Sequence, residues 1–190
     1  MAGAARQRAP ILSVAAFRDR LTSRPDEEHW ELIGGGPMMM TPPTGYHQRI
    51  ATNLDVLLVN ALRAHGPSRT AFQGVGLNIF SEDPYDPQPD VVVVDRPTSD
   101  ERYYDRFYLV AEVLSESDKR IIASKRDIYR AHPFCSCILL IRKDCVEVTI
   151  DMRSNGTWLS RVLHDNDELH LPEFGLICPV KALYQDTPLG

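Results

Sequence analysis

Two acidic residues stand in or beside apolar, β-branched runs, where a carboxylate is hard to accommodate. Pro89-Asp90 leads directly into four valines at 91–94, and Glu112 lies in the middle of the apolar run 109–114. Burying a carboxylate without a compensating partner costs free energy, and both runs have the character of buried strands. Two such acids on consecutive strands suggest one shared partner, and a divalent cation is the simplest. The pattern therefore indicates a pair of metal-binding acids.

A lysine and a tyrosine follow the second acid on a predicted helix. Lys125 comes about a dozen residues after Glu112, and Tyr129 lies one helical turn further on. Mg²⁺ binds oxygen ligands, commonly one or two carboxylates with waters, and it can neutralise a phosphate and activate a bound water. A lysine beside it would orient that water or stabilise the charged phosphate. Acid, acid and lysine around Mg²⁺, with Mn²⁺ as an alternative, are the groups that phosphodiester hydrolysis requires.

The bulk composition is that of an ordinary globular protein. The chain has 190 residues, with 43% hydrophobic and 25% charged residues and a net charge of -5. The negative charge argues against a protein that coats nucleic acid, since such domains are usually basic, but acidic metal ligands leave a nuclease open. No apolar run approaches the roughly 20 residues of a membrane span. The run 11–17 is too short for a signal peptide, so we expect no membrane association and a cytoplasmic location.

Cysteine usage gives no sign of a disulfide framework. We expect the four cysteines to be free and mostly buried thiols. A zinc site would favour two close cysteine pairs, and only Cys135 and Cys137 form one.

Local patterns divide the chain into a tail at 1–12 and a single domain at 13–190. Runs of strands separated by two main helices predict an α/β (α+β) fold with a mixed central sheet flanked by helices. Asn155-Gly156 is the strongest hairpin signal, and the acidic run 81–86 is typical of a solvated loop. Predicted helices span 14–21, 46–64 and 117–131, and a short helix or turn is expected around 180–184. Predicted strands span 30–33, 38–40, 71–80, 91–94, 107–114, 137–141, 146–152, 157–163 and 169–172.

The ordered set of motifs resembles a known family. Trp30-Glu31-Leu32-Ile33 precedes a glycine turn, and a proline loop then leads to His47 on a helix. Pro89-Asp90, Glu112-Val113-Leu114-Ser115, and Lys125 with Tyr129 follow in order. This arrangement resembles the Uma-two family of restriction endonucleases within the PD-(D/E)XK nuclease superfamily, over roughly residues 13–184.

The resemblance implies a restriction-endonuclease-like core and Mg²⁺-dependent cleavage of DNA. It implies that Asp90 and Glu112 are the two metal-binding acids, with the carbonyl of Val113 as a third ligand. The usual lysine of the E-x-K motif would fall at Leu114, and the family places a lysine on the following helix, where Lys125 stands. The catalytic set implied is then the following: Asp90, Glu112, Lys125 and Glu31. His47 and Tyr129 are implied as substrate-binding residues.

Alternative interpretations of these residues stay open. Asp90 could begin a strand after a turn, Lys125 could be a solvated helix residue, and His47 could be a structural contact at a helix start. Tyr129 could pack the helix on the sheet and donate to a carboxylate. The whole chain could be a binding module for nucleic acid or protein that has lost cleavage, or a structural protein with a buried acid pair. A homodimer is a further expectation, since superfamily nucleases pair to cut both strands.

Overall fold

A computed structural model describes residues 11–25, 27–79, 84–98, 100–115, 118 and 121–190. Its centre is a six-stranded sheet in the order β10-β9-β8-β7-β5-β3, in which β7 and β8 are parallel and the other neighbours antiparallel. The strands are β3 (Arg69–Phe72), β5 (Val91–Asp95), β7 (Phe107–Leu114), β8 (Cys137–Arg142), β9 (Glu147–Ser154) and β10 (Thr157–His164). The predicted mixed sheet is confirmed.

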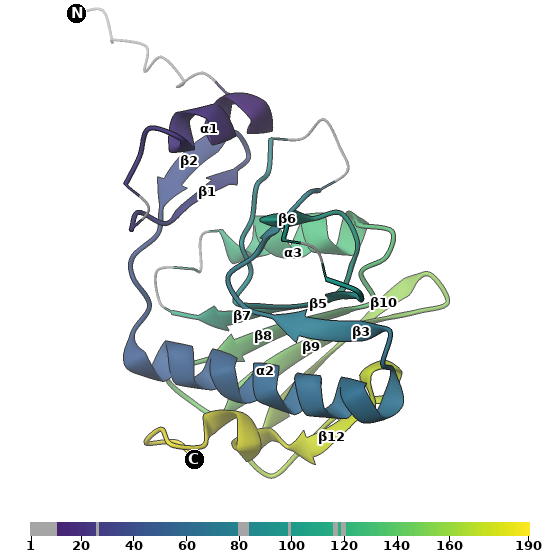
Figure 1. Cartoon of the computed structure of the whole chain (residues 1–190). Helices are drawn as coiled ribbons and strands as arrows, with labels where there is room; N and C mark the ends of the chain where they lie inside the picture. Colours follow the sequence, from purple (N-terminus) through teal and green to yellow (C-terminus); the bar gives the residue numbers. More distant parts are fainter. Residues whose placement is uncertain (1–10, 26, 80–83, 99, 116–117, 119–120) are drawn as a thin grey trace, which may run out of the picture.

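One long helix covers each face of this sheet (Figure 1). Helix α2 (Gly45–His65) packs on one face and α3 (Ile122–Ala131) on the other. The four valines of β5 divide between the two apolar cores, with Val91 and Val93 in the core under α2 and Val92 and Val94 in the core under α3. Because both faces of the strand are covered, its sequence is continuously apolar rather than alternating.

The first elements form a small unit at the edge of the molecule (Figure 1). It consists of α1 (Val14–Leu21) and the antiparallel pair β1 (Trp30–Ile33) and β2 (Gly36–Met39). The turn between the two strands requires positive φ at Gly34 (57°) and Gly35 (78°), a conformation that glycine adopts readily.

The chain ends beneath α2. Strands β11 (Glu168–Leu171) and β12 (Leu176–Pro179) pair with each other. The short helix η2 (Pro172–Phe174) lies between them in the chain, and η3 (Val180–Tyr184) follows β12. The amide of Asn53 on α2 donates to the carbonyl of Leu183 at 3.0 Å, which ties this segment to the helix.

Several predictions need correction. The predicted strand 71–80 is wrong as one element, because Gly74 (φ 68°) lies between β3 and the short β4 (Gly76–Leu77), which pairs with an unpredicted β6 (Tyr103–Tyr104). Residues 117, 119 and 120 of the predicted helix 117–131 and most of the tail 1–12 lie outside the described residues, and α3 begins at Ile122. Strand β12 was not predicted either.

The predictions of a hairpin and of free cysteines are confirmed. The Asn155-Gly156 hairpin joins β9 to β10 as predicted, with Asn155 (φ 50°) and Gly156 (φ 77°) in the turn. All four cysteines are free, and three of them are buried. No helix in the described part of the chain is long and apolar enough to cross a membrane.

Candidate active site

The two predicted metal acids lie side by side at one end of the sheet. Strand β5 runs antiparallel to β7, with Val91 opposite Ala111. Continuing that register by one residue sets Asp90 opposite Glu112, and cross-strand neighbours of this kind share one face of a sheet. Residues 22 positions apart in the sequence are therefore brought together by strand pairing alone.

Asp90 is held on both of its carboxylate oxygens. Its Oδ1 lies 2.8 Å from Nε2 of His47, and its Oδ2 accepts from the backbone N–H of Val113 at 2.6 Å. His47 comes from the first turn of α2, whose N-cap is Thr44. Burial alone would lower the pKa of His47, but the hydrogen bond to Asp90 and the negative charge of Asp90 outweigh it and raise the pKa. The His47–Asp90 pair therefore favours a charged imidazolium.

Lys125 is the centre of the site. Its side chain is buried, and Nζ lies 2.8 Å from Oε1 of Glu112 and 3.0 Å from Oε1 of Glu31. Burial would lower the pKa of this lysine, yet the two carboxylates outweigh burial and raise it. The ammonium thus stays charged, and α3 delivers it to the acids of β7 and β1.

Two further groups complete the polar shell around these acids. The hydroxyl of Tyr129 donates to Oε1 of Glu112 at 2.7 Å, and the backbone N–H of Gln88 donates to Oε1 of Glu31 at 3.1 Å. The other oxygen of Glu31, Oε2, is buried and has no hydrogen-bond partner among the residues that the structure describes. Since buried polar atoms are normally satisfied, this oxygen is an acceptor in need of a ligand.

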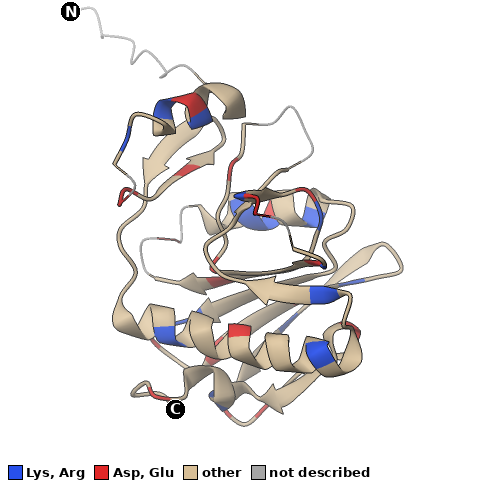
Figure 2. Ribbon diagram, viewed as in Figure 1, with Lys and Arg blue, Asp and Glu red and all other residues tan. Residues whose placement is uncertain are grey.

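The cluster carries more negative than positive charge. Burial is the main cause that raises the pKa of Glu112 to about 7, the negative charges of Asp90 and Glu31 add to it, and Lys125 opposes it. Elsewhere acidic and basic residues lie on several elements rather than being gathered on one (Figure 2).

These residues fit a hard divalent cation. No three His, Cys, Asp or Glu side chains within the described residues already form a metal-binding group. Mg²⁺, however, needs only one or two carboxylates and keeps waters, and Asp90 opposite Glu112 supplies that pair. The N–H of Val113 faces Asp90, and the C=O of a strand residue points to the same edge as its N–H. The carbonyl of Val113 is thus on the side of the two acids.

The structure brings all the sequence-predicted site residues together. Tyr129 packs in the core beneath α3, with no exposed side-chain surface, and bonds Glu112. Leu114, at the usual lysine position, packs against the same core.

Sequence reasoning missed two buried acids and their arginine partners. Asp86 was expected in a solvated loop, but it is fully buried and bonds Arg18 on α1. Asp151 on β9 is also fully buried and bonds Arg126 and Arg130 of α3. The spacing of the two arginines by one helical turn was the only available signal.

A mixed sheet covered by a helix on each face, with two opposed acids and a lysine at one end, is the architecture of restriction-endonuclease-like proteins. Residues 14–181 match the family model described as "Uma2: Putative restriction endonuclease", and the chain belongs to this family. A comparison with curated proteins finds no match.

A solved structure shares the fold. The crystal structure of "a putative nuclease belonging to DUF820" from Anabaena variabilis ATCC 29413 is 16% identical in sequence and superimposes with a TM-score of 0.72. The match covers 91% of this chain and 97% of that one. At this identity the likeness establishes the fold alone.

Proposed function

We propose that this chain is a metal-dependent endodeoxyribonuclease that hydrolyses phosphodiester bonds in DNA. The observation that carries the proposal is the convergence of Glu31, Asp90 and Glu112, from three separate segments, around the buried Lys125. Folding does not require an acid cluster of this kind, because replacing buried ionic groups by apolar residues of similar volume often leaves a protein as stable or more stable. Membership of a restriction-endonuclease family supports a nucleic-acid substrate.

Asp90, Glu112 and the carbonyl of Val113 would hold Mg²⁺, or Mn²⁺ as an alternative. When bound, the metal supplies charge neutralisation at the phosphate and a water of lowered pKa. His47 holds Oδ1 of Asp90, and Tyr129 holds Oε1 of Glu112. These contacts fix the orientation of both carboxylates.

Lys125 acts as a fixed positive charge. Its raised pKa, caused by the carboxylates of Glu112 and Glu31, keeps the ammonium protonated at neutral pH. We therefore assign it to stabilising negative charge on the attacked phosphate rather than to accepting a proton. Glu31 neutralises part of the positive charge of Lys125 and, together with Glu112, restrains Nζ.

The test is cleavage of supercoiled plasmid in Mg²⁺ or Mn²⁺ beside Asp90→Ala and Glu112→Ala variants. We expect nicking by the parent that disappears in both variants and in chelator, with the far-ultraviolet circular dichroism unchanged. Asp127→Ala is a matched control, because Asp127 is an exposed acid on α3. Cutting by either site variant at the parent's rate would show that the site is assigned wrongly.

A second candidate is a binding module for nucleic acid or protein that has lost cleavage. The observation that favours it is that protein donors already engage both oxygens of Asp90. Titration calorimetry with Mn²⁺, followed by a mobility-shift assay on duplex DNA, separates the two. DNA binding without metal binding or nicking would support the module. The homodimer also stays a prediction, and light scattering coupled to gel filtration tests it.

A further inference from the structure

The unit that carries Glu31 has its own small core. Leu12, Phe17 and Leu32 form a buried cluster that is separate from the two cores of the main sheet. Glu31 nevertheless reaches Lys125, which lies 94 positions further along the chain. Its position therefore depends on the contacts that join this N-terminal unit, residues 11–39, to the body of the protein.

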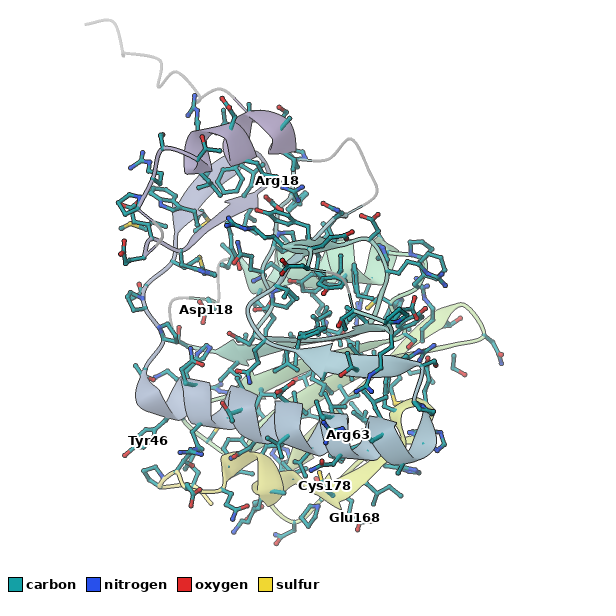
Figure 3. The ribbon with its side chains drawn as sticks, viewed as in Figure 1. Arg18, Tyr46, Arg63, Asp118, Glu168 and Cys178 are labelled. Carbon is teal, nitrogen blue, oxygen red and sulfur yellow. The ribbon has the colours of Figure 1, made fainter. Side chains whose placement is uncertain are left out.

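Arg18 makes the most extensive of these contacts. From α1 its Nε and Nη2 donate to the two carboxylate oxygens of Asp86 at 2.9 and 2.8 Å, and Nη2 also donates to Oδ1 of Asn78 at 2.7 Å. Its guanidinium lies 3.4 Å from the ring centroid of Tyr103. Figure 3 shows Arg18 between the N-terminal unit and the body. A bidentate arginine–carboxylate pair of this kind fixes the relative orientation of the two side chains as well as their distance.

Asp86 passes this restraint on to the strand that carries Glu31. The side chain of Asp86 is fully buried, and its backbone exchanges two hydrogen bonds with Leu32, the neighbour of Glu31, at 2.9 and 3.3 Å. Two residues beyond Asp86, the N–H of Gln88 donates to Glu31 itself. The segment that ends in Asp90 thus forms hydrogen bonds with two consecutive residues of β1, Glu31 and Leu32.

We infer that Arg18 and Asp86 are positioning residues that set Glu31 against Lys125 in the candidate active site. Neither side chain touches Glu31, so both act through the backbone pairing of Asp86 with Leu32. The geometric part of this inference stands on contacts alone, and its effect on cleavage rests on the proposed function. A purely structural role would instead make Arg18 matter for global stability and leave β1 no looser than the rest of the protein.

The first test measures local opening and needs no cleavage. Hydrogen exchange by mass spectrometry is compared for the parent, Arg18→Gln and the control Arg20→Gln, in which an exposed arginine on the same helix is changed. We expect exchange in β1 to accelerate on the order of tenfold or more in Arg18→Gln, with β7 and β8 unchanged. Acylation of the buried Lys125 should accelerate in the same variant. Exchange that rises equally in all strands, or only as in Arg20→Gln, would overturn the inference.

The second test links the pair to Glu31. If Arg18 acts through Glu31, Arg18→Gln slows single-turnover nicking in the parent background but not in a Glu31→Gln background. Equal slowing in both backgrounds contradicts a positioning role. If the parent cuts no DNA, the proposed nuclease function fails, while the exchange and acylation experiments still decide the inference. Arg18→Lys keeps the positive charge but cannot donate two parallel hydrogen bonds to Asp86. Its rate of exchange in β1 should lie between those of the parent and Arg18→Gln.

Discussion

Asp151→Asn tests how α3, and Lys125 with it, is held on the sheet. Asp151 on β9 has no exposed surface, and each of its oxygens accepts from Arg126, at 2.5 Å in both cases. Arg130, one turn further along α3, also bonds Oδ2, at 2.9 Å from Nη2. One buried carboxylate thus anchors two arginines of the helix. The variant keeps the shape of the side chain but removes the charge that both guanidinium groups face.

The expected cost follows from burial. Breaking a buried ion pair by removing one partner costs about 3–5 kcal/mol. The two arginine side chains are 27% and 29% exposed, so water partly solvates the charges left behind, and the cost falls to roughly 2–4 kcal/mol. For a chain of this length each kcal/mol shifts Tm by about 2–4 °C. We therefore expect Tm to fall by roughly 4–16 °C.

The dependence on pH gives a second signature. Burial would raise the pKa of Asp151, but hydrogen bonds from Arg126 and Arg130 outweigh it and lower the pKa below its ordinary value of 3.8. A lowered carboxylate pKa adds stability that is complete above the unfolded pKa and is lost as the pH falls through the folded one. The gap between the parent and Asp151→Asn should therefore be constant above about pH 5 and shrink below about pH 4.

Urea unfolding at several pH values measures both signatures. Asp127→Asn on the exposed side of α3 is the control and should lie within about 0.5 kcal/mol of the parent. An Asp151→Asn protein as stable as the parent at pH 7 would refute the anchoring role. A gap that stays unchanged down to pH 3 would refute the ionic origin of the effect.

Two further predictions concern Glu112. Glu112→Gln should stabilise the protein in chelator at pH 8 by roughly 1–3 kcal/mol. Folding raises the pKa of Glu112 from 4.5 to about 7, so the carboxylate charge that forms as the pH rises destabilises the folded state. Glutamine removes that charge. Thermal unfolding at pH 8 and pH 5 checks this, and an equal gain at both pH values would contradict it. Tyr129→Phe leaves the packing intact but removes a donor to the buried Glu112, so urea unfolding should show a loss of about 1–2 kcal/mol. A neutral result would mean that Lys125 alone satisfies that oxygen.

Local chemistry explains why much of the fold was predictable. The four valines at 91–94 are typical of a strand covered on both faces, and Asn155-Gly156 supplied the positive φ values that a tight hairpin requires. Asp90 and Glu112 could be paired because consecutive strands place their acids at one end. In each case the determining interactions lie within a few residues or between neighbouring strands.

The unpredicted features depend on contacts between distant segments. The acidic character of 81–86 suggested a solvated loop, and only the arrival of Arg18 from α1 makes burial of Asp86 favourable. The same is true of Asp151, whose partners come from α3. An aspartate gives the same local sequence signal whether it is buried or solvated. What makes burial favourable is a cation that the tertiary fold places beside it.

The placement of the lysine on a helix has a consequence that can be tested directly. Leu114 follows Glu112 by two residues on β7, so the two side chains point to the same face of the sheet. An ammonium at position 114 would also lie near Glu112, but without the second carboxylate that restrains Lys125. We expect Lys125→Met to abolish nicking, and Leu114→Lys combined with Lys125→Met to restore part of it. Such rescue would mean that a positive charge near Glu112 is the requirement, whereas no rescue in a folded double variant would mean that Glu31 must hold that charge in place.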